Sequence, residues 1–159
     1  MPRTAPRSLS ANAGLAFVGE RTARTALIPP GMAERMLGLR NPHGKSNADV
    51  LRQLVNSLEP EPDSLLWQVD FPDEMSEHEA SLYAHPFHHL YRTVRPIRTR
   101  WWANRQANPR LRAALAKRER YLATAIAGRH PGFQWVDSCL LPTDSLLAIA
   151  PASHFTLVL

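Results

Sequence analysis

The sequence holds a single cysteine and no long apolar run in its 159 residues. Cys139 by itself cannot form an internal disulfide or a cysteine-based zinc cluster, so we expect a reducing, cytoplasmic compartment. No segment approaches the roughly 18 apolar residues of a membrane-spanning helix, and we expect no membrane partner. No activating base lies beside Cys139, which we therefore interpret as a buried structural thiol.

Glycine is also scarce, at seven residues, and the motifs built on glycine are missing. No Gly-x-Gly loop follows an expected strand, so this chain shows no binding loop for a nucleotide or for S-adenosylmethionine. The Gly-x-Ser-x-Gly elbow of serine hydrolases is absent too. Residues 41–44, Asn-Pro-His-Gly, superficially resemble the Asn-Pro-Pro-aromatic motif of DNA amino-methyltransferases, but Gly44 has no ring to stack on an extruded base. We expect no cofactor in this chain and no enzyme activity from it alone.

Histidines gather in one segment, as His78, His85, His88 and His89. Spacings of three and four residues can place metal ligands on one face of a helix. An ordinary polar helix face is the simpler interpretation, because no cysteine accompanies the histidines and Pro86 disturbs their geometry. A small metal-dependent enzyme is therefore the last of our function hypotheses, and we predict no metal ligand.

Charge, in contrast, is plentiful and segregated. The formal net charge is +5, with a sequence pI of about 10.1. Residues 59–79 contain eight carboxylates and no Lys or Arg, whereas residues 92–120 contain ten Lys or Arg and one carboxylate. A basic block that also carries Trp101, Trp102 and Tyr121 is typical of nucleic-acid binding. The alternative is a solvated basic face whose partner is the acidic segment 59–79 of the same chain.

The cationic side chains of this block can track the phosphates of a duplex. They are Arg92, Arg95, Arg98, Arg100, Arg105, Arg110, Arg112, Lys117, Arg118 and Arg120. We interpret Trp101 and Trp102 as core or interface residues in preference to base-stacking platforms.

Short apolar segments bounded by turn residues predict several strands. They cover residues 14–19, 64–71, 121–127, 133–136 and 146–150, with a last one at 154–159.

Helices are predicted from caps and spacing. One begins at Pro30 and ends at Gly38, and a turn-rich loop follows at residues 41–47. Asn47 is expected to cap a helix with an apolar stripe at positions 50, 51, 54, 55 and 58. Ser76 and Glu79 form a capping box ahead of the next helix, which Pro86 should kink or divide. Residues 109–115 predict one more short helix.

The irregular alternation of helices and strands predicts an α+β (mixed α/β) fold, a single domain with a small mixed sheet packed by several short helices. Residues 1–13 are expected to be a flexible lead-in and residues 14–159 the domain. Because the sequence ends inside an apolar run, we expect the domain to be incomplete at the C-terminal strand.

Several motifs, in one order, resemble the MmeI-like DNA methyltransferases of bacterial and phage restriction-modification systems. Residues 41–52 are similar to Asn-Pro-x-Gly-Lys/Arg-x-Asn-Ser-Asp-Val-Leu-Arg, and residues 67–71 to Trp-Ile-Ile-Asp-Phe. Residues 75–87 are similar to Met-Ser/Pro-Glu-Glu-Glu-Ala-Ala-Leu-Tyr-x-x-Pro-Phe. The remaining matched segments are 94–96, 100–102, 120–124 and 141–145.

The resemblance spans residues 14–159 and implies the DNA target-recognition domain of such a protein, without its catalytic domain. S-adenosylmethionine would then bind only to a separate catalytic domain or subunit, which this chain would position on duplex DNA. The expected DNA contacts are Lys45, Arg52, Arg98, Arg100 and Arg120, of which all but Arg98 lie in matched motifs.

The chain also departs from the family pattern. Residues 53–59 replace Pro-Trp-x-Asn-Gly-x-Asp, and the acidic residues 60–63 stand where many members are basic. Acidic residues would repel phosphate, so a second hypothesis remains open. In it the chain is an interaction or regulatory module that docks on a methyltransferase subunit and binds little DNA.

Overall fold

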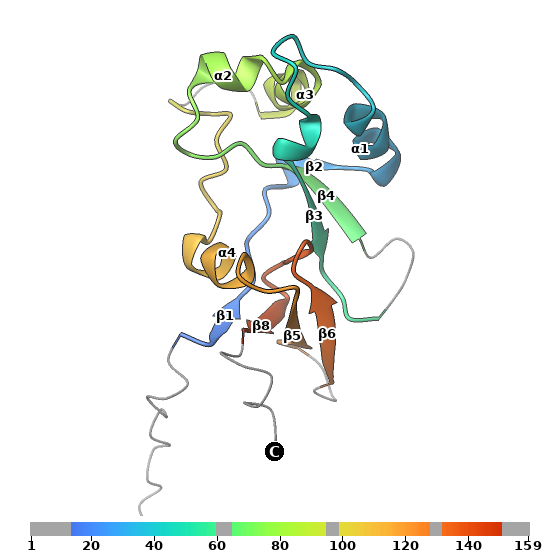
Figure 1. Cartoon of the computed structure of the whole chain (residues 1–159), viewed down its shortest axis with the longest axis vertical. Helices are drawn as coiled ribbons and strands as arrows, with labels where there is room; N and C mark the ends of the chain where they lie inside the picture. The colour runs from blue at the N-terminus through green and yellow to red at the C-terminus, as the bar shows by residue number, and fades with distance from the viewer. Residues whose placement is uncertain (1–13, 60–64, 95–98, 128–131, 151–159) are drawn as a thin grey trace, which may run out of the picture.

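The computed structural model describes residues 14–59, 65–94, 99–127 and 132–150. It confirms the α+β class, with the strands divided between two four-stranded sheets. Figure 1 shows one sheet at the lower end with the helix α4 (Pro109–Leu115), and the other running up beneath the remaining helices. The segments 1–13 and 154–159, predicted as a lead-in and a strand, lie outside the described residues.

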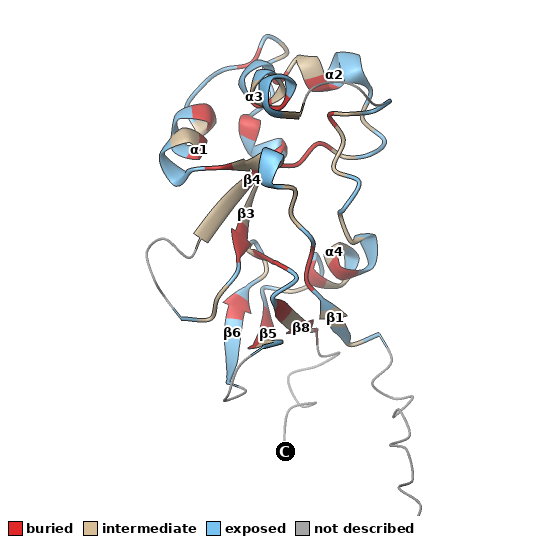
Figure 2. Ribbon diagram, turned by 180° about the vertical axis from the view of Figure 1, so that it is seen from behind, coloured by how far each residue is buried: buried red, intermediate tan, exposed pale blue. Residues whose placement is uncertain are grey.

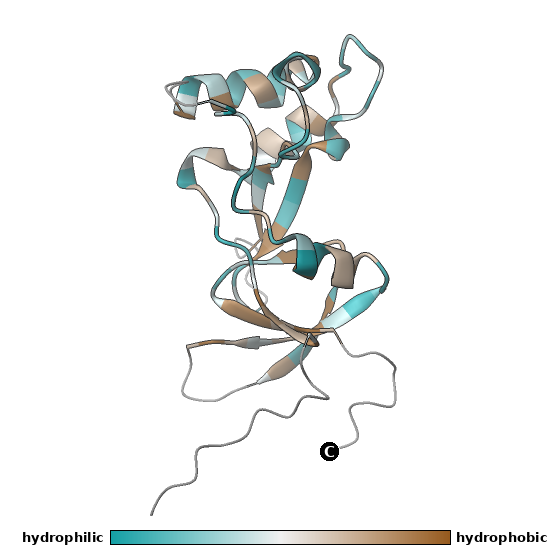
Figure 3. Cartoon of the chain, turned by 90° about the vertical axis from the view of Figure 1, so that its left-hand side faces the viewer, coloured by the Kyte–Doolittle hydropathy of each residue, from teal (hydrophilic) through white to brown (hydrophobic). Residues whose placement is uncertain are grey.

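The lower sheet is entirely antiparallel and has the order β1-β8-β5-β6. Its strands are β1 (Ala16–Val18), β8 (Leu146–Ile149), β5 (Arg120–Ala125) and β6 (Phe133–Asp137). Each lies within one residue of a predicted segment or inside it, which confirms those predictions. Figure 3 shows apolar residues along this sheet together with polar ones.

The upper sheet is mixed, with the order β2-β4-β3-β7. Its strands are β2 (Leu27–Ile28), β4 (Leu65–Val69), β3 (Leu51–Val55) and β7 (Leu141–Pro142), and only the β3–β7 pair is parallel. The strand predicted around β4 is confirmed. The two-residue strands β2 and β7 carry too little periodicity to be predicted from sequence.

The predicted helix at residues 47–58 is wrong. A single 3-10 turn, η3 (Asn47–Asp49), leads directly into the strand β3. Leu51 belongs to the apolar core of the upper sheet, and Leu54 and Val55 belong to the core shared by the lower sheet and α4. Because β3 is buried against both cores, its apolar residues do not alternate, and their spacing imitated a helical stripe. Figure 2 shows these buried positions along β3.

The other predicted helices are confirmed. Helix α1 (Pro30–Leu37) begins with proline at its first position and is followed by Gly38, and it buries Ala33 and Met36. Helix α4 begins after Asn108, whose side chain accepts from the Leu111 N–H at 3.2 Å. Within the described ranges, no helix combines the length and apolar content needed to cross a membrane.

Pro86 divides the third helical segment into two helices, α2 (Glu77–Ser81) and α3 (Ala84–Val94). A proline is tolerated only in the first turn of a helix, so α3 begins two residues before it. The capping box that starts α2 is complete. The hydroxyl and the backbone N–H of Ser76 donate to the Glu79 carboxylate at 2.7 Å and 3.0 Å, and these bonds lower the pKa of Glu79.

Cys139 is exposed, so its prediction as a buried thiol is wrong. It lies in the turn between β6 and β7, where its backbone N–H donates to the Asp137 carboxylate at 2.9 Å. Apolar strands flank this turn in the sequence, but hydrogen bonding of the turn to Asp137 keeps the thiol at the surface.

Candidate nucleic-acid interface

The loop that carries Lys45 is held by two asparagines. The Asn41 amide donates to the Lys45 carbonyl at 3.0 Å and to the Asn47 side chain at 2.8 Å. Asn47, which is fully buried, donates in turn to the Met36 carbonyl at the end of α1 at 2.7 Å. Gly44 adopts a φ of +78°, which a residue with a side chain would adopt only with strain. The loop therefore presents Lys45 to solvent from a fixed backbone.

Arg52 projects from β3 and is largely engaged within the protein. Its guanidinium donates to the Ala48 and Leu51 carbonyls at 3.0 Å and 3.3 Å. Its Nε lies 3.5 Å from the Asp70 carboxylate, and 39% of the Arg52 side chain is exposed. An intramolecular ion pair of this kind competes with binding to a phosphate.

Asp70 belongs to a buried charge cluster in which Arg112 is the central cation. The Arg112 guanidinium donates to both oxygens of Asp70, at 2.7 Å and 3.0 Å, and to both oxygens of Glu20, at 2.6 Å and 2.7 Å. The side chains of Glu20 and Asp70 are 0% and 3% exposed. Burial by itself would lower the pKa of Arg112, but the hydrogen bonds to the two carboxylates raise it above its ordinary value.

We interpret this cluster as structural, because each charged group in it is paired with a group of opposite charge. From the sequence we expected Arg112 among the phosphate contacts and selected neither Glu20 nor Asn104. Asn104 donates to Asp70 at 2.7 Å, and its own side-chain oxygen accepts from the Gln106 N–H at 3.1 Å. One sequence signal could have indicated the buried carboxylates. Each of them follows an apolar strand segment, Glu20 after β1 and Asp70 after β4.

Arg100 lies at the start of the segment that joins α3 to α4. Its φ of +58° is unusual for a residue other than glycine, and its Nε lies 3.9 Å from the Asp73 carboxylate. The next two residues anchor the segment. Trp102 is buried and donates to the Met75 carbonyl at 3.1 Å, whereas Trp101 donates to the Glu77 carboxylate at 3.3 Å. Both indoles serve packing, as the sequence analysis expected.

Trp101 completes a stack of aromatic rings on α3. Its ring centroid lies 5.1 Å from that of Phe87, 5.6 Å from that of Tyr91 and 6.0 Å from that of Trp102. Such tilted and edge-on contacts are favourable arrangements for aromatic pairs. These contacts hold Trp101 against α3, while Tyr91 stays 54% exposed.

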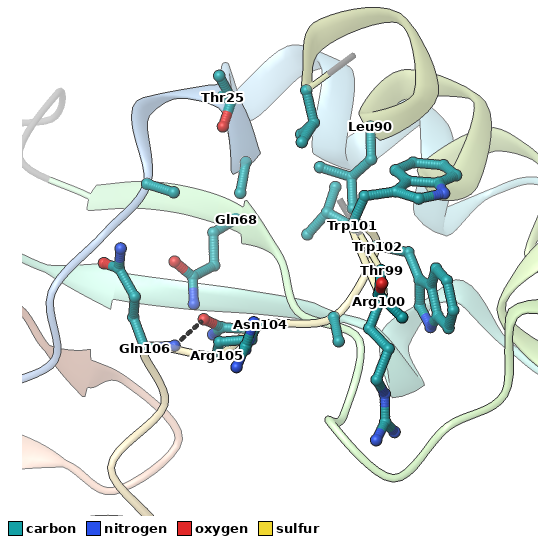
Figure 4. A pocket seen from close by; sticks show the side chains of 15 residues that line it. Thr25, Gln68, Leu90, Thr99, Arg100, Trp101, Trp102, Asn104, Arg105 and Gln106 are labelled. Carbon is teal, nitrogen blue, oxygen red and sulfur yellow. Dashed lines mark hydrogen bonds between the residues drawn. The ribbon is translucent and has the colours of Figure 1, made fainter. Parts of the chain in front are cut away.

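A cleft of about 410 Å³ opens behind this segment. Figure 4 shows its walls, which come from the 3-10 turn η2 (Arg24–Ala26), from β4, from α3 and from residues 99–106. Arg100 and Arg105 line it together with the amides of Gln68, Asn104 and Gln106. Of the four predicted contact residues that the structure describes, Arg100 alone lines this cleft.

Arg120 lies on the lower sheet, away from the cleft-lining residues. Its guanidinium carbon sits 4.9 Å from the centroid of the Trp135 ring on the neighbouring strand β6, a cation–π distance. Trp135 is 43% exposed and Phe133 is 54% exposed. By strand register, both aromatics share one face of the sheet with Val18 of β1, which is 51% exposed.

The structure therefore does not gather the predicted contacts into one site. Lys45 lies in a loop beside α1, Arg52 on β3, Arg100 on the cleft and Arg120 on β5, while Arg98 lies outside the described residues. In the part of the chain that the structure places, no hydrogen bond or ion pair joins any two of these four. Among the described residues, no group of three or more His, Cys, Asp or Glu side chains could hold a metal ion.

Searches with this chain found no matching family model, no matching curated protein and no matching solved structure.

Proposed function

We propose that this chain is a DNA target-recognition module, or the remnant of one. It binds duplex DNA in the cytoplasm and positions a separate adenine methyltransferase domain, which holds the S-adenosylmethionine. The order of motifs along residues 41–145 suggests the family, and the surface charge carries the DNA-binding part of the proposal.

The central observation is a set of exposed cations near α4 and β5. Arg110, Lys117 and Arg120 are exposed, and among the described residues none of the three has an ion-pair partner. The buried carboxylates Glu20 and Asp70 are neutralised by Arg112 and by Arg52. This pairing removes two carboxylates and two arginines from the surface balance, so the net charge of +5 stays on the other groups, and a positive surface attracts phosphate.

Salt dependence of duplex binding tests the proposal. We expect affinity to fall steeply as salt rises, with a log–log slope of about 0.9 per phosphate contact. A triple variant, Arg110→Gln, Lys117→Gln and Arg120→Gln, should bind more weakly and show a shallower slope. The measurement is fluorescence anisotropy with a labelled duplex at several salt concentrations.

A charge-matched triple variant provides the control. Arg21→Gln, Arg35→Gln and Arg40→Gln remove the same charge from exposed positions outside residues 92–120. We expect this control to keep the slope of the unmodified chain. Equal losses in both triple variants, or no duplex binding at low salt, would contradict the proposal.

A second candidate function is docking on a methyltransferase subunit with little DNA binding. It is favoured by the exposed apolar face of the lower sheet, formed by Val18, Phe133 and Trp135. Exposed aromatic and β-branched side chains on one sheet face are common in protein interfaces. A double variant, Phe133→Ser and Trp135→Ser, should abolish co-elution with the partner subunit, whereas the charge variant should not.

A further inference from the structure

We propose that the cleft beside residues 99–106 binds a single unstacked nucleotide, with an adenine base against Gln68 and the phosphate on Arg105. The cleft volume of about 410 Å³ lies within the range of about 300–1,000 Å³ for small-molecule sites. This proposed nucleotide site is separate from the proposed duplex-binding surface, because the two consist of different residues.

Gln68 is the strongest reason for placing a ligand here. It is the fourth of the five residues of β4 and is only 2% exposed. Its side-chain nitrogen is buried and has no hydrogen-bond partner among the described residues. Figure 4 shows the Gln68 amide extending from β4 toward the segment of Asn104 and Gln106. A buried N–H without an acceptor is costly, and an acceptor atom on a ligand would satisfy it.

The wall opposite Gln68 is preorganised. The Asn104 backbone N–H donates to the Phe71 carbonyl at 2.8 Å, and the Asn104 side chain bonds Asp70 at 2.7 Å. Asp70 itself is held by Arg112 at 2.7 Å. The polar groups of this wall are therefore fixed before a ligand arrives, which reduces the entropy lost on binding.

The charge of the lining selects an anionic ligand. Among the described residues, the lining includes two guanidinium groups, Arg100 and Arg105, and no carboxylate. Arg105 is exposed and has no ion-pair partner in the part of the chain that the structure describes. Guanidinium groups bind phosphate through charge-assisted, often bidentate hydrogen bonds.

The chemistry of the amide selects the base. A glutamine side chain offers a donor and an acceptor side by side, and this pair matches the N7 acceptor and the N6 amino donor of adenine. Leu90, Val94 and Val69 add an apolar wall for a planar ring. A ligand with an adenine edge and a phosphate would contact the Gln68 amide and the Arg105 guanidinium at once.

The first experiment is a calorimetric titration of the full chain with dAMP, adenosine, dTMP and inorganic phosphate. We expect dAMP to bind more tightly than any of the other three. A single strand and a duplex that each contain adenine then identify the source of the nucleotide. Binding of dAMP alone identifies a free nucleotide, and binding of the single strand as well identifies an unstacked base in DNA.

Two variants assign the binding to the cleft. Gln68→Leu should weaken dAMP binding roughly tenfold or more, and should leave the melting temperature unchanged or higher because an unsatisfied donor is removed. Arg105→Gln should weaken dAMP binding and leave adenosine binding unchanged. Gln134→Leu, the same substitution at an exposed position of β6, is the matched control and should bind as the unmodified chain does.

Two outcomes would overturn the inference. One is the absence of dAMP binding in the calorimetric titration. The other is dAMP binding that neither Gln68→Leu nor Arg105→Gln weakens. The triple variant at positions 110, 117 and 120 separates the two proposals, because it should lose duplex affinity and retain dAMP binding.

Discussion

Arg112 donates to both carboxylate oxygens of Glu20, from Nε to Oε1 at 2.6 Å and from Nη2 to Oε2 at 2.7 Å. Glu20 follows β1 of the lower sheet, and Arg112 also binds Asp70, which follows β4 of the upper sheet. One guanidinium on α4 therefore joins segments of both sheets. Among the described residues, Glu20 and Asp70 are the buried carboxylates, and both are held by this guanidinium.

Replacement of Arg112 should reveal how much stability this cluster provides. Arg112→Met leaves Glu20 and Asp70 buried without their main cation, and we expect a loss of about 3–5 kcal/mol in the free energy of unfolding. Urea denaturation followed by circular dichroism measures it. The neighbouring exposed position is the control, and Arg110→Met should change stability by no more than about 0.5 kcal/mol. Similar losses in the two variants would argue against a buried charge cluster.

Two glycines should respond in opposite directions to alanine. A Cβ at Gly19 would lie 2.1 Å from the Thr143 carbonyl oxygen and 2.5 Å from that of Pro142, both rigid backbone atoms. Gly19→Ala should therefore destabilise the fold by about 3 kcal/mol, the upper end of typical overpacking costs. Gly31 lies in α1, where an added Cβ would make only an ordinary contact of 3.8 Å with the Arg35 guanidinium, and Gly31→Ala should stabilise the protein by up to about 1 kcal/mol. Thermal melting of both variants would show the opposite signs, and equal destabilisation would contradict the close approach at Gly19.

Protonation of His89 should lower the free energy of unfolding in mild acid. Burial, and then the charge of Arg92, lower the pKa of His89 in the folded protein. The unfolded chain therefore binds this proton at higher pH, and stability decreases as the pH falls through the unfolded value of about 6.5 toward the lower folded value. His89→Gln should reduce the difference in unfolding free energy between about pH 7.5 and about pH 5.5. His85→Gln, at an exposed position of α3, is the control, and an unchanged pH dependence in His89→Gln would refute the assignment.

Cys139 should react with thiol reagents in the folded protein, but slowly. Its side chain is exposed, while partial burial and a hydrogen bond to Asp137 raise the pKa of the thiol. Because only the thiolate reacts, labelling with a maleimide should go to completion at a rate below that of the unfolded chain. Asp137→Asn should accelerate labelling, and Asp144→Asn, which removes an exposed carboxylate, should not. Mass spectrometry over time follows the reaction; equal rates in the two variants would remove the role of Asp137.

Local signals predicted much of the secondary structure. The signals that were read correctly each act within a few residues, so they are visible in the local sequence. They are the proline at the first position of α1 and of α4, the capping box of α2 and the division at Pro86. Strand β3 shows where this reasoning fails. Its spacing favours a helix, yet pairing with β4 and β7 and burial against both cores make it a strand. Those partners lie outside the sequence window and cannot be read from it.

For the candidate site, the sequence determined the segregation of charge and the aromatic anchors at Trp101 and Trp102, because these depend on residue type and order. Only the tertiary structure decided which charges remain available. In the fold, Arg112 pairs with Glu20 and Asp70, and Arg105 stays exposed on a cleft. Gln68 is buried, and its side-chain nitrogen has no hydrogen-bond partner among the described residues. The physical reason is that burial and ion pairing depend on contacts between distant segments, such as the one between Glu20 and Arg112, which are 92 residues apart. Sequence spacing carries no direct record of such contacts.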